Sequence, residues 1–133
     1  MSIQEIRTGL ADNLATISGL RVSIDIPDNP TPPQAVIAIE TVGFDNAFGQ
    51  GLTQYSFTVS LIASRVSERN AQRKLDDYTS NGAQSVKLAI ESDKTLGGKA
   101  YDVRVTEMTN IGTVILGEVI YLAADFAVIV YAD

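Results

Sequence analysis

The side chains in this chain that could carry acid–base chemistry are carboxylates that lie close together in the sequence. Asp76 is followed by Asp77, and Glu91 is separated from Asp93 by one residue. Two carboxyl groups at a suitable separation can act as general acid and general base. The sequence contains no histidine and no cysteine, so the most common proton-transfer residue and thiolate nucleophiles are absent. Since no pattern around either pair indicates a pocket, surface charge on helices is the favoured interpretation, and we expect neither an enzyme nor a cofactor.

A further acidic group could in principle bind a cation. Asp25, Asp28 and Asn29 are close in sequence, but their spacing does not match a calcium-binding loop and Pro27 restricts the backbone between them. Side chains of this kind more often stabilise turns. We therefore expect no metal site here.

Three arginines recur at intervals of four residues. Arg65, Arg69 and Arg73 would lie along one face of a helix if that helix begins early enough. One interpretation is a contact with nucleic acid. Glu68 and Asp76 are close enough in sequence to neutralise the series, which favours an ionic surface that faces solvent or a neighbouring subunit. We predict a subunit interface that includes the three arginines.

The most unusual stretch is residues 43–51, which combine three glycines with two phenylalanines. It lacks the Gly-Lys-Ser/Thr ending of a phosphate-binding loop and contains no basic residue. It could be a long connection whose aromatic rings fold back on the core, or a loop that orders against a partner. For the second interpretation, the predicted contact residues are Phe44, Asp45, Asn46, Phe48 and Gln50.

Length and charge limit the class of protein. The 133 residues fit a single domain over residues 1–133. The net charge of -6 disfavours specific binding of nucleic acid, because such a surface repels phosphates. No apolar stretch is long enough to span a membrane, and the first residues do not form a signal peptide. We expect a protein made and kept in cytoplasm, without membrane contact.

The spacing of apolar residues predicts the elements that must position these side chains. Intervals of three and four predict a first helix, on Ile3, Ile6, Leu10, Leu14 and Ile17. Alternation predicts a short strand over residues 21–26 and a long strand over residues 54–63. Between them, residues 35–40 form a nearly continuous apolar run, typical of a strand that is covered on both faces or packed in an interface. We assign Ile37 and Ile39 to the predicted subunit interface.

Two helices and three strands are predicted for the second half. Ser67 is a candidate N-cap of a helix that ends near residues 81–82, and another helix follows. The apolar positions of these helices are Ala71, Leu75 and Tyr78, then Val86, Ala89 and Ile90. Turn signals at Asn110 with Gly112 and near Ala123 divide the rest into strands over residues 101–108, 113–121 and 124–131. The order α-β-β-β-α-α-β-β-β predicts an α+β fold with a mostly antiparallel sheet and helices packed on one face.

Several of these segments form a recognisable combination. They are the amphipathic first helix, the proline-rich residues 27–33, the strand of residues 55–64, the helical residues 69–78 and 82–90, the turn of residues 93–98 and the apolar last strand. Together they resemble the tail terminator and tail completion proteins of long-tailed, siphovirus-like bacteriophages. The resemblance covers nearly the full length of the chain and includes no catalytic motif.

The resemblance implies a structural protein of the virion, located at the junction of tail and neck and assembled in the host cytoplasm. It implies a homo-hexameric ring that caps the tail tube, ends tube polymerisation and offers a docking surface for the head. The partners would be the tail-tube protein and a head-tail connector or stopper protein, with DNA passing through the lumen without sequence-specific binding. A connector or stopper subunit of the neck is the alternative within this class. A small acidic ligand-binding domain or enzyme is the alternative outside it.

Overall fold

The described part of the chain contains three helices and five strands in a computed structural model. It comprises residues 3–17, 19–23, 32–44, 53–67, 69–80 and 85–132. The helices are α1 (Ile3–Leu14), α2 (Ala71–Thr79) and α3 (Val86–Ile90). The strands are β1 (Arg21–Ser23), β2 (Gln34–Phe44), β3 (Thr53–Arg65), β4 (Asp102–Leu116) and β5 (Val119–Ala132).

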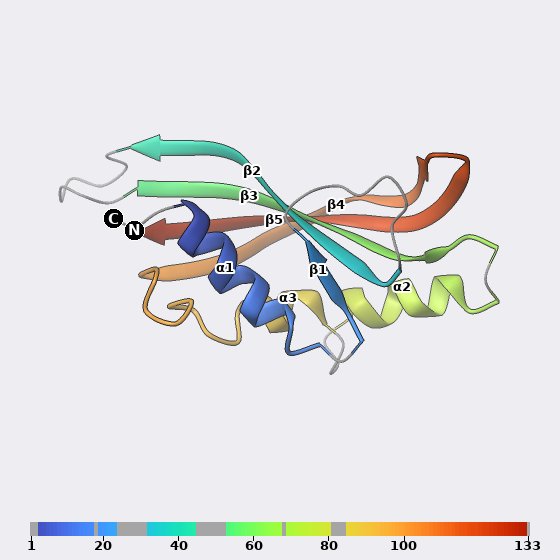
Figure 1. The fold of residues 1–133 in the computed structure, drawn as a ribbon, viewed down its shortest axis with the longest axis horizontal. Helices are drawn as coiled ribbons and strands as arrows, with labels where there is room; N and C mark the ends of the chain where they lie inside the picture. The colour runs from blue at the N-terminus through green and yellow to red at the C-terminus, as the bar shows by residue number, and fades with distance from the viewer. Residues whose placement is uncertain are drawn as a thin grey trace.

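The strands form one sheet in the order β1-β2-β3-β5-β4. Only the short pair of β1 and β2 is parallel, and the other three pairs are antiparallel. The helices lie on the same side of the sheet, with α1 crossing one half, α2 beneath the other and α3 between them (Figure 1). The predicted α+β class, with a mostly antiparallel sheet covered on one face, is confirmed.

The end of the chain forms two long strands where we predicted three. Residues 102–108 and the first part of residues 113–121 belong to β4, and the chain reverses at residues 117–118 to enter β5. Asn110 and Gly112 have positive φ values of 52° and 153°, but they lie where the β4–β5 register shifts and not in a turn. Extra residues of this kind form a bulge that bends a strand without ending it. The predicted turn near Ala123 is wrong because this residue is buried inside β5.

Strand β3 follows the predicted alternation closely. From Thr53 to Leu61 every second residue is buried, and the side chains between them are half-buried on the opposite face of the sheet. The buried face packs against the helices, as the period of two requires. The core cluster contains buried apolar residues of all three helices, among them Leu10, Leu75 and Ile90, together with Tyr55, Phe57, Val59 and Leu61 of β3.

Helix α2 begins later than the N-cap prediction at Ser67 requires. The backbone N–H of Val66 still donates to the carbonyl of Ile120 at 3.0 Å, so the chain remains bonded to β5 beyond the end of β3. The helix therefore starts at Ala71, after Asn70. Ser85, in contrast, caps α3, because its Oγ accepts a hydrogen bond from the N–H of Leu88 at 3.2 Å. The predicted apolar positions of both helices are buried.

A turn between α3 and β4 packs closely against α1. The carboxylate of Asp93 accepts hydrogen bonds from the N–H and the hydroxyl of Thr95 and from the N–H of Gly97. These bonds hold Leu96 at a φ of 51° with its side chain fully buried. A Cβ added to Gly9 in α1 would lie 2.7 Å from the Leu96 Cβ. The helix can approach the turn this closely only because residue 9 has no side chain.

Asn13 joins the same two segments by hydrogen bonds. Its buried Nδ2 donates to the carbonyl of Ile90 at 2.8 Å and to that of Asp93 at 3.0 Å. The carbonyl of Ile90 lies at the end of α3, where no helical donor follows. Asn13 thereby supplies a partner for a helix-terminal carbonyl that α3 itself leaves open.

We predict that Gly9→Ala destabilises the protein. Alanine favours a helix by up to about 1 kcal/mol over glycine. The added methyl group must displace Leu96, however, and such overpacking costs about 1 to 3 kcal/mol. The free energy of unfolding, measured by denaturant titration, should fall relative to Gln4→Ala, a control on the exposed face of α1. An unchanged or higher stability would contradict the packing described here.

Candidate functional site

The three arginines of the predicted interface are all exposed, but they do not share a helical face. Arg65 is the last residue of β3, Arg69 lies in the following turn, and only Arg73 belongs to α2. The helical-face prediction is wrong because β3 extends as far as Arg65 and the helix starts only at Ala71. Among the residues that the structure describes, none of the three guanidinium groups has an ion-pair partner.

Ile37 and Ile39 do not form a second interface patch. Ile37 is completely buried in the core cluster, and Ile39 is partly buried against the same cluster. Their side chains point towards the helices, because alternate residues of β2 face the covered side of the sheet. The prediction that Ile37 contacts a neighbouring subunit is therefore wrong, and the apolar run belongs to the core of this copy.

The predicted partner loop starts at one end of the sheet. The backbone of Phe44 pairs with Thr53, and Thr53 pairs with Ala132. The side chain of Phe44 and the residues Asp45, Asn46, Phe48 and Gln50 lie outside the described residues, so this contact stays a prediction. The predicted cation group of Asp25, Asp28 and Asn29 also lies outside them.

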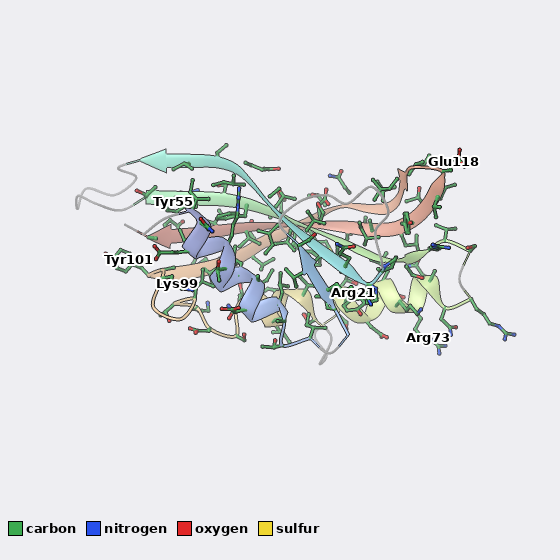
Figure 2. All side chains as sticks on the ribbon, viewed as in Figure 1. Arg21, Tyr55, Arg73, Lys99, Tyr101 and Glu118 are labelled. Atoms are coloured by element: carbon green, nitrogen blue, oxygen red, sulfur yellow. The ribbon has the colours of Figure 1, made fainter. Side chains whose placement is uncertain are left out.

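The two described residues that flank the predicted loop, Phe44 and Thr53, lie at the opposite end of the sheet from Arg65. Strand β3 has 13 residues, from Thr53 beside the loop to Arg65 at the far end. At about 3.3 Å per residue these ends are roughly 40 Å apart. Figure 2 shows the same separation, with Tyr101 at one end of the long axis and Arg73 and Glu118 at the other. The two predicted surfaces can thus serve two different contacts.

A group of exposed apolar side chains lies at the same end of the sheet as the arginines. Ile115 of β4 is directly opposite Ile120 of β5, and Val66 bonds to the backbone of Ile120. Their exposed fractions are 67% for Ile115, 46% for Ile120 and 42% for Val66. We call these three residues, together with Arg65, Arg69 and Arg73, the hairpin-end surface.

Sequence reasoning missed the apolar part of the hairpin-end surface. Ile115 and Ile120 alternate with other residues as in any strand that faces a core. The available signal was that residues 108–117 contain no charged side chain. Large apolar groups that remain exposed together are typical of protein-binding surfaces, and arginine is enriched in such interfaces.

Two of the hollows on the described surface are lined mainly by residues of the sheet. The open-face hollow, about 350 Å³, lies on the sheet face opposite the helices and is lined by Val36, Ile62, Val114, Leu116, Asn110 and Asp125, among others. In it, the carboxylate of Asp125 accepts a hydrogen bond from the Asn110 amide at 2.9 Å. The edge hollow, about 240 Å³, lies where β4 meets α2 and α3. It is lined by Thr79, Lys87, Val105, Thr106, Glu107, Met108 and Phe126.

The carboxylates considered for acid–base chemistry form no paired site. Asp76 and Asp77 are exposed on α2. Glu91 accepts hydrogen bonds from the Lys87 ammonium and from the N–H of Val105, which ties α3 to β4. Asp93 serves the turn beside Gly9. The carboxylates of Glu91 and Asp93 thus accept hydrogen bonds that stabilise the fold.

The surroundings of these two carboxylates change their acidity. Partial burial raises the pKa of Glu91, but the hydrogen bonds from Lys87 and Val105 outweigh this effect and bring the pKa below its ordinary value of 4.5. The hydrogen bonds from Thr95 and Gly97 lower the pKa of Asp93 below its ordinary value of 3.8. Both groups are therefore charged near neutral pH, and both stabilise the folded chain in that form.

Among the described residues, no cluster of three or more His, Cys, Asp or Glu side chains could hold a metal ion. None of the helices within that part of the chain is long and apolar enough to cross a membrane. Neither the known protein-family models nor the curated protein sequences contain a match to this chain.

We predict that acid weakens the fold through Glu91 and Asp93. A carboxylate with a lowered folded pKa contributes stability above its unfolded pKa and loses it as the pH falls through the folded value. Stability should therefore decline as the pH drops below about 4.5, where Glu91 begins to protonate in the unfolded chain. Urea unfolding at a series of pH values measures this decline.

Glu91→Gln should remove part of this pH dependence and cost about 1 to 2 kcal/mol at neutral pH, because a charged acceptor is replaced by a neutral one. Asp12→Asn, which changes an exposed carboxylate on α1, is the control. A Glu91→Gln variant with the pH profile of the parent would show that this hydrogen-bonded link does not stabilise the fold.

Proposed function

We propose that this chain is a structural subunit of a bacteriophage tail, of the tail terminator kind. It caps the tail tube as a homo-hexameric ring, ends tube polymerisation and offers a docking surface for the head. The observation that carries the proposal is the hairpin-end surface, an exposed apolar patch at the same end of the sheet as three arginines that have no ion-pair partner among the described residues. Exposed apolar side chains together with arginines are typical of a surface that binds another protein.

The two-ended shape supports the same role. A terminator must contact its neighbours in the ring, the tail tube on one side and the head-tail connector on the other. Here Thr53, which follows the predicted partner loop in the chain, and the hairpin-end surface are separated by the full length of β3. One end can therefore contact the tube through Phe44 and Phe48 while the other contacts a different protein.

The acidic charge is compatible with a DNA channel. Each of six copies would contribute a formal net charge of -6. A wall of that sign repels phosphates, so DNA can slide through the lumen without being held. No sequence-specific contact with DNA is required for this function.

One observation favours a different class of function. The open-face hollow is mostly apolar and contains one carboxylate, Asp125, which is the usual composition of a small-ligand site. A ligand-binding domain of this kind would act as a single copy. Within the structural class, a connector or stopper subunit would use the same surfaces but would contact the portal side of the neck.

Electron microscopy of a phage lysate in which this gene alone is disrupted separates these functions. A terminator should leave filled heads beside free tails that are overlong or ragged. Tails of uniform length beside heads that have lost their DNA would assign the chain to the connector. Intact infectious particles would contradict both structural roles and favour the ligand-binding alternative.

We predict that replacing Phe44 and Phe48 by serine abolishes attachment to the tail tube. The two rings would lose the apolar contact that orders the loop on its partner, whereas the core does not depend on them in this interpretation. Complementation of the disrupted gene, scored by electron microscopy, should give uncapped tails. The denaturation midpoint of the purified variant should match that of the parent.

Tyr101→Ser is the matched control, because Tyr101 is 56% exposed and lies at the same end of the molecule. Normal capping by the Phe44→Ser, Phe48→Ser double variant would show that the loop does not contact the tube. A large loss of stability would instead place the two rings in the core.

A further inference from the structure

The positive charge of this chain is concentrated in one short segment. Residues 65–74 hold four of the ten basic side chains and one of the sixteen acidic ones. This segment therefore carries a formal charge of +3, and the remaining residues carry -9. Because a second copy offers mostly negative surface, two copies attract each other when the arginine end of one approaches another part of its neighbour.

The apolar part of the hairpin-end surface cannot be covered by its own helices. Val66, Ile115 and Ile120 stay exposed although α2 begins at the same end of the sheet (Figure 1). Ile115 is the most exposed of the large apolar side chains that the structure describes, at 67%. Burying such a side chain removes about 25 cal/mol of free energy per Å² of apolar surface, which favours a neighbour that offers a matching hollow.

The edge hollow could receive an apolar side chain from the hairpin-end surface. Val105, Met108 and Phe126 give it an apolar lining. Its charged members are Glu107, which is exposed, and Lys87, whose ammonium is paired with Glu91. No described residue forms an ion pair with Glu107. An isoleucine seated in this hollow would bring the arginine end of one copy close to Glu107, which has no ion-pair partner among the described residues.

One copy cannot make this contact with itself. Glu107 and Ile115 lie on the same strand, β4, eight residues apart. At about 3.3 Å per residue they are separated by roughly 26 Å of hydrogen-bonded sheet. The isoleucines of one copy can therefore reach only the hollow of another.

We propose that the hairpin-end surface of one copy docks in the edge hollow of a second copy, with its arginines close to Glu107 of that copy. The two surfaces differ, so the contact is heterologous, and repeated contacts form a closed ring or an open filament. This inference rests on the proposed ring and names the surfaces that would build it. It also assigns the arginines to a protein partner and not to nucleic acid.

Cysteine pairs test the contact directly, because the chain has no cysteine of its own. Ile115→Cys combined with Thr106→Cys places one thiol on each proposed surface, and both side chains are exposed. Mild oxidation followed by non-reducing electrophoresis should give a ladder of dimers, trimers and larger species. The matched control, Ile115→Cys with Ile3→Cys, uses an exposed position on α1 and should remain mostly monomeric.

Each outcome decides between contacts. If the Ile115→Cys, Thr106→Cys pair stays monomeric, or gives no more multimer than the control pair, the proposal is wrong. Strong dimer formation by Ile115→Cys alone would show that the hairpin ends of two copies contact each other. Such a contact is isologous, and it would also show that the proposal is wrong. A ladder that stops at dimers when Ile115→Cys and Thr106→Cys chains are mixed, each as a single variant, supports the two-surface geometry.

Charge reversal gives an independent test. Arg69→Glu should reduce the ladder several-fold, and adding Glu107→Lys should restore it, since each change alone opposes like charges across the contact. A folding defect cannot produce this rescue. The opposite result would be that Arg69→Glu abolishes a salt-sensitive binding of duplex DNA and leaves the ladder unchanged. The arginines would then bind nucleic acid, and the proposal would be wrong.

The lysate experiment separates this inference from the proposed function. Overlong tails together with a cysteine-pair variant that stays monomeric would support the terminator role and contradict this contact. A clear ladder together with intact infectious particles would support the self-association and contradict the tail role.

Discussion

A strand residue advances the chain by about 3.3 Å and a helical residue by 1.5 Å, and this difference decides how much of the sheet the helices cover. Strand β4 has 15 residues and reaches roughly 50 Å, whereas the 12 residues of α1 reach about 18 Å. Three short helices cannot extend over every part of so long a sheet. The isoleucines of the β4–β5 hairpin remain uncovered for this reason, although they are spaced like core residues.

The same geometry explains which features the sequence predicts. Helix α1 and strand β3 each bury one regular stripe, so their periods of 3.6 and 2 appear directly in the residue pattern. Ile37 was assigned to an interface because an apolar run does not show which of its side chains face the helices. Asn110 and Gly112 are equally good signals for a turn and for a bulge, and only pairing with β5 distinguishes the two.

The candidate site was harder to predict because it depends on relative lengths and not on local pattern. Arg65, Arg69 and Arg73 were found from their spacing, but their arrangement follows from where β3 ends. The exposure of Ile115 depends on the extent of α2, which lies more than thirty residues earlier in the chain. The link from Glu91 to Val105 likewise joins two elements whose proximity no spacing rule indicates.

The central pairing of the sheet has a consequence for how the chain is made. Strand β3 is bonded on one side to β2 and on the other to β5, and Thr53 pairs with Ala132. During synthesis, β2 and β3 can form a hairpin early, but one edge of β3 stays open until β5 leaves the ribosome. Contacts between such distant residues slow folding, and an open apolar edge invites aggregation in the interval. The nascent chain is therefore expected to depend on chaperones until its last strand is complete.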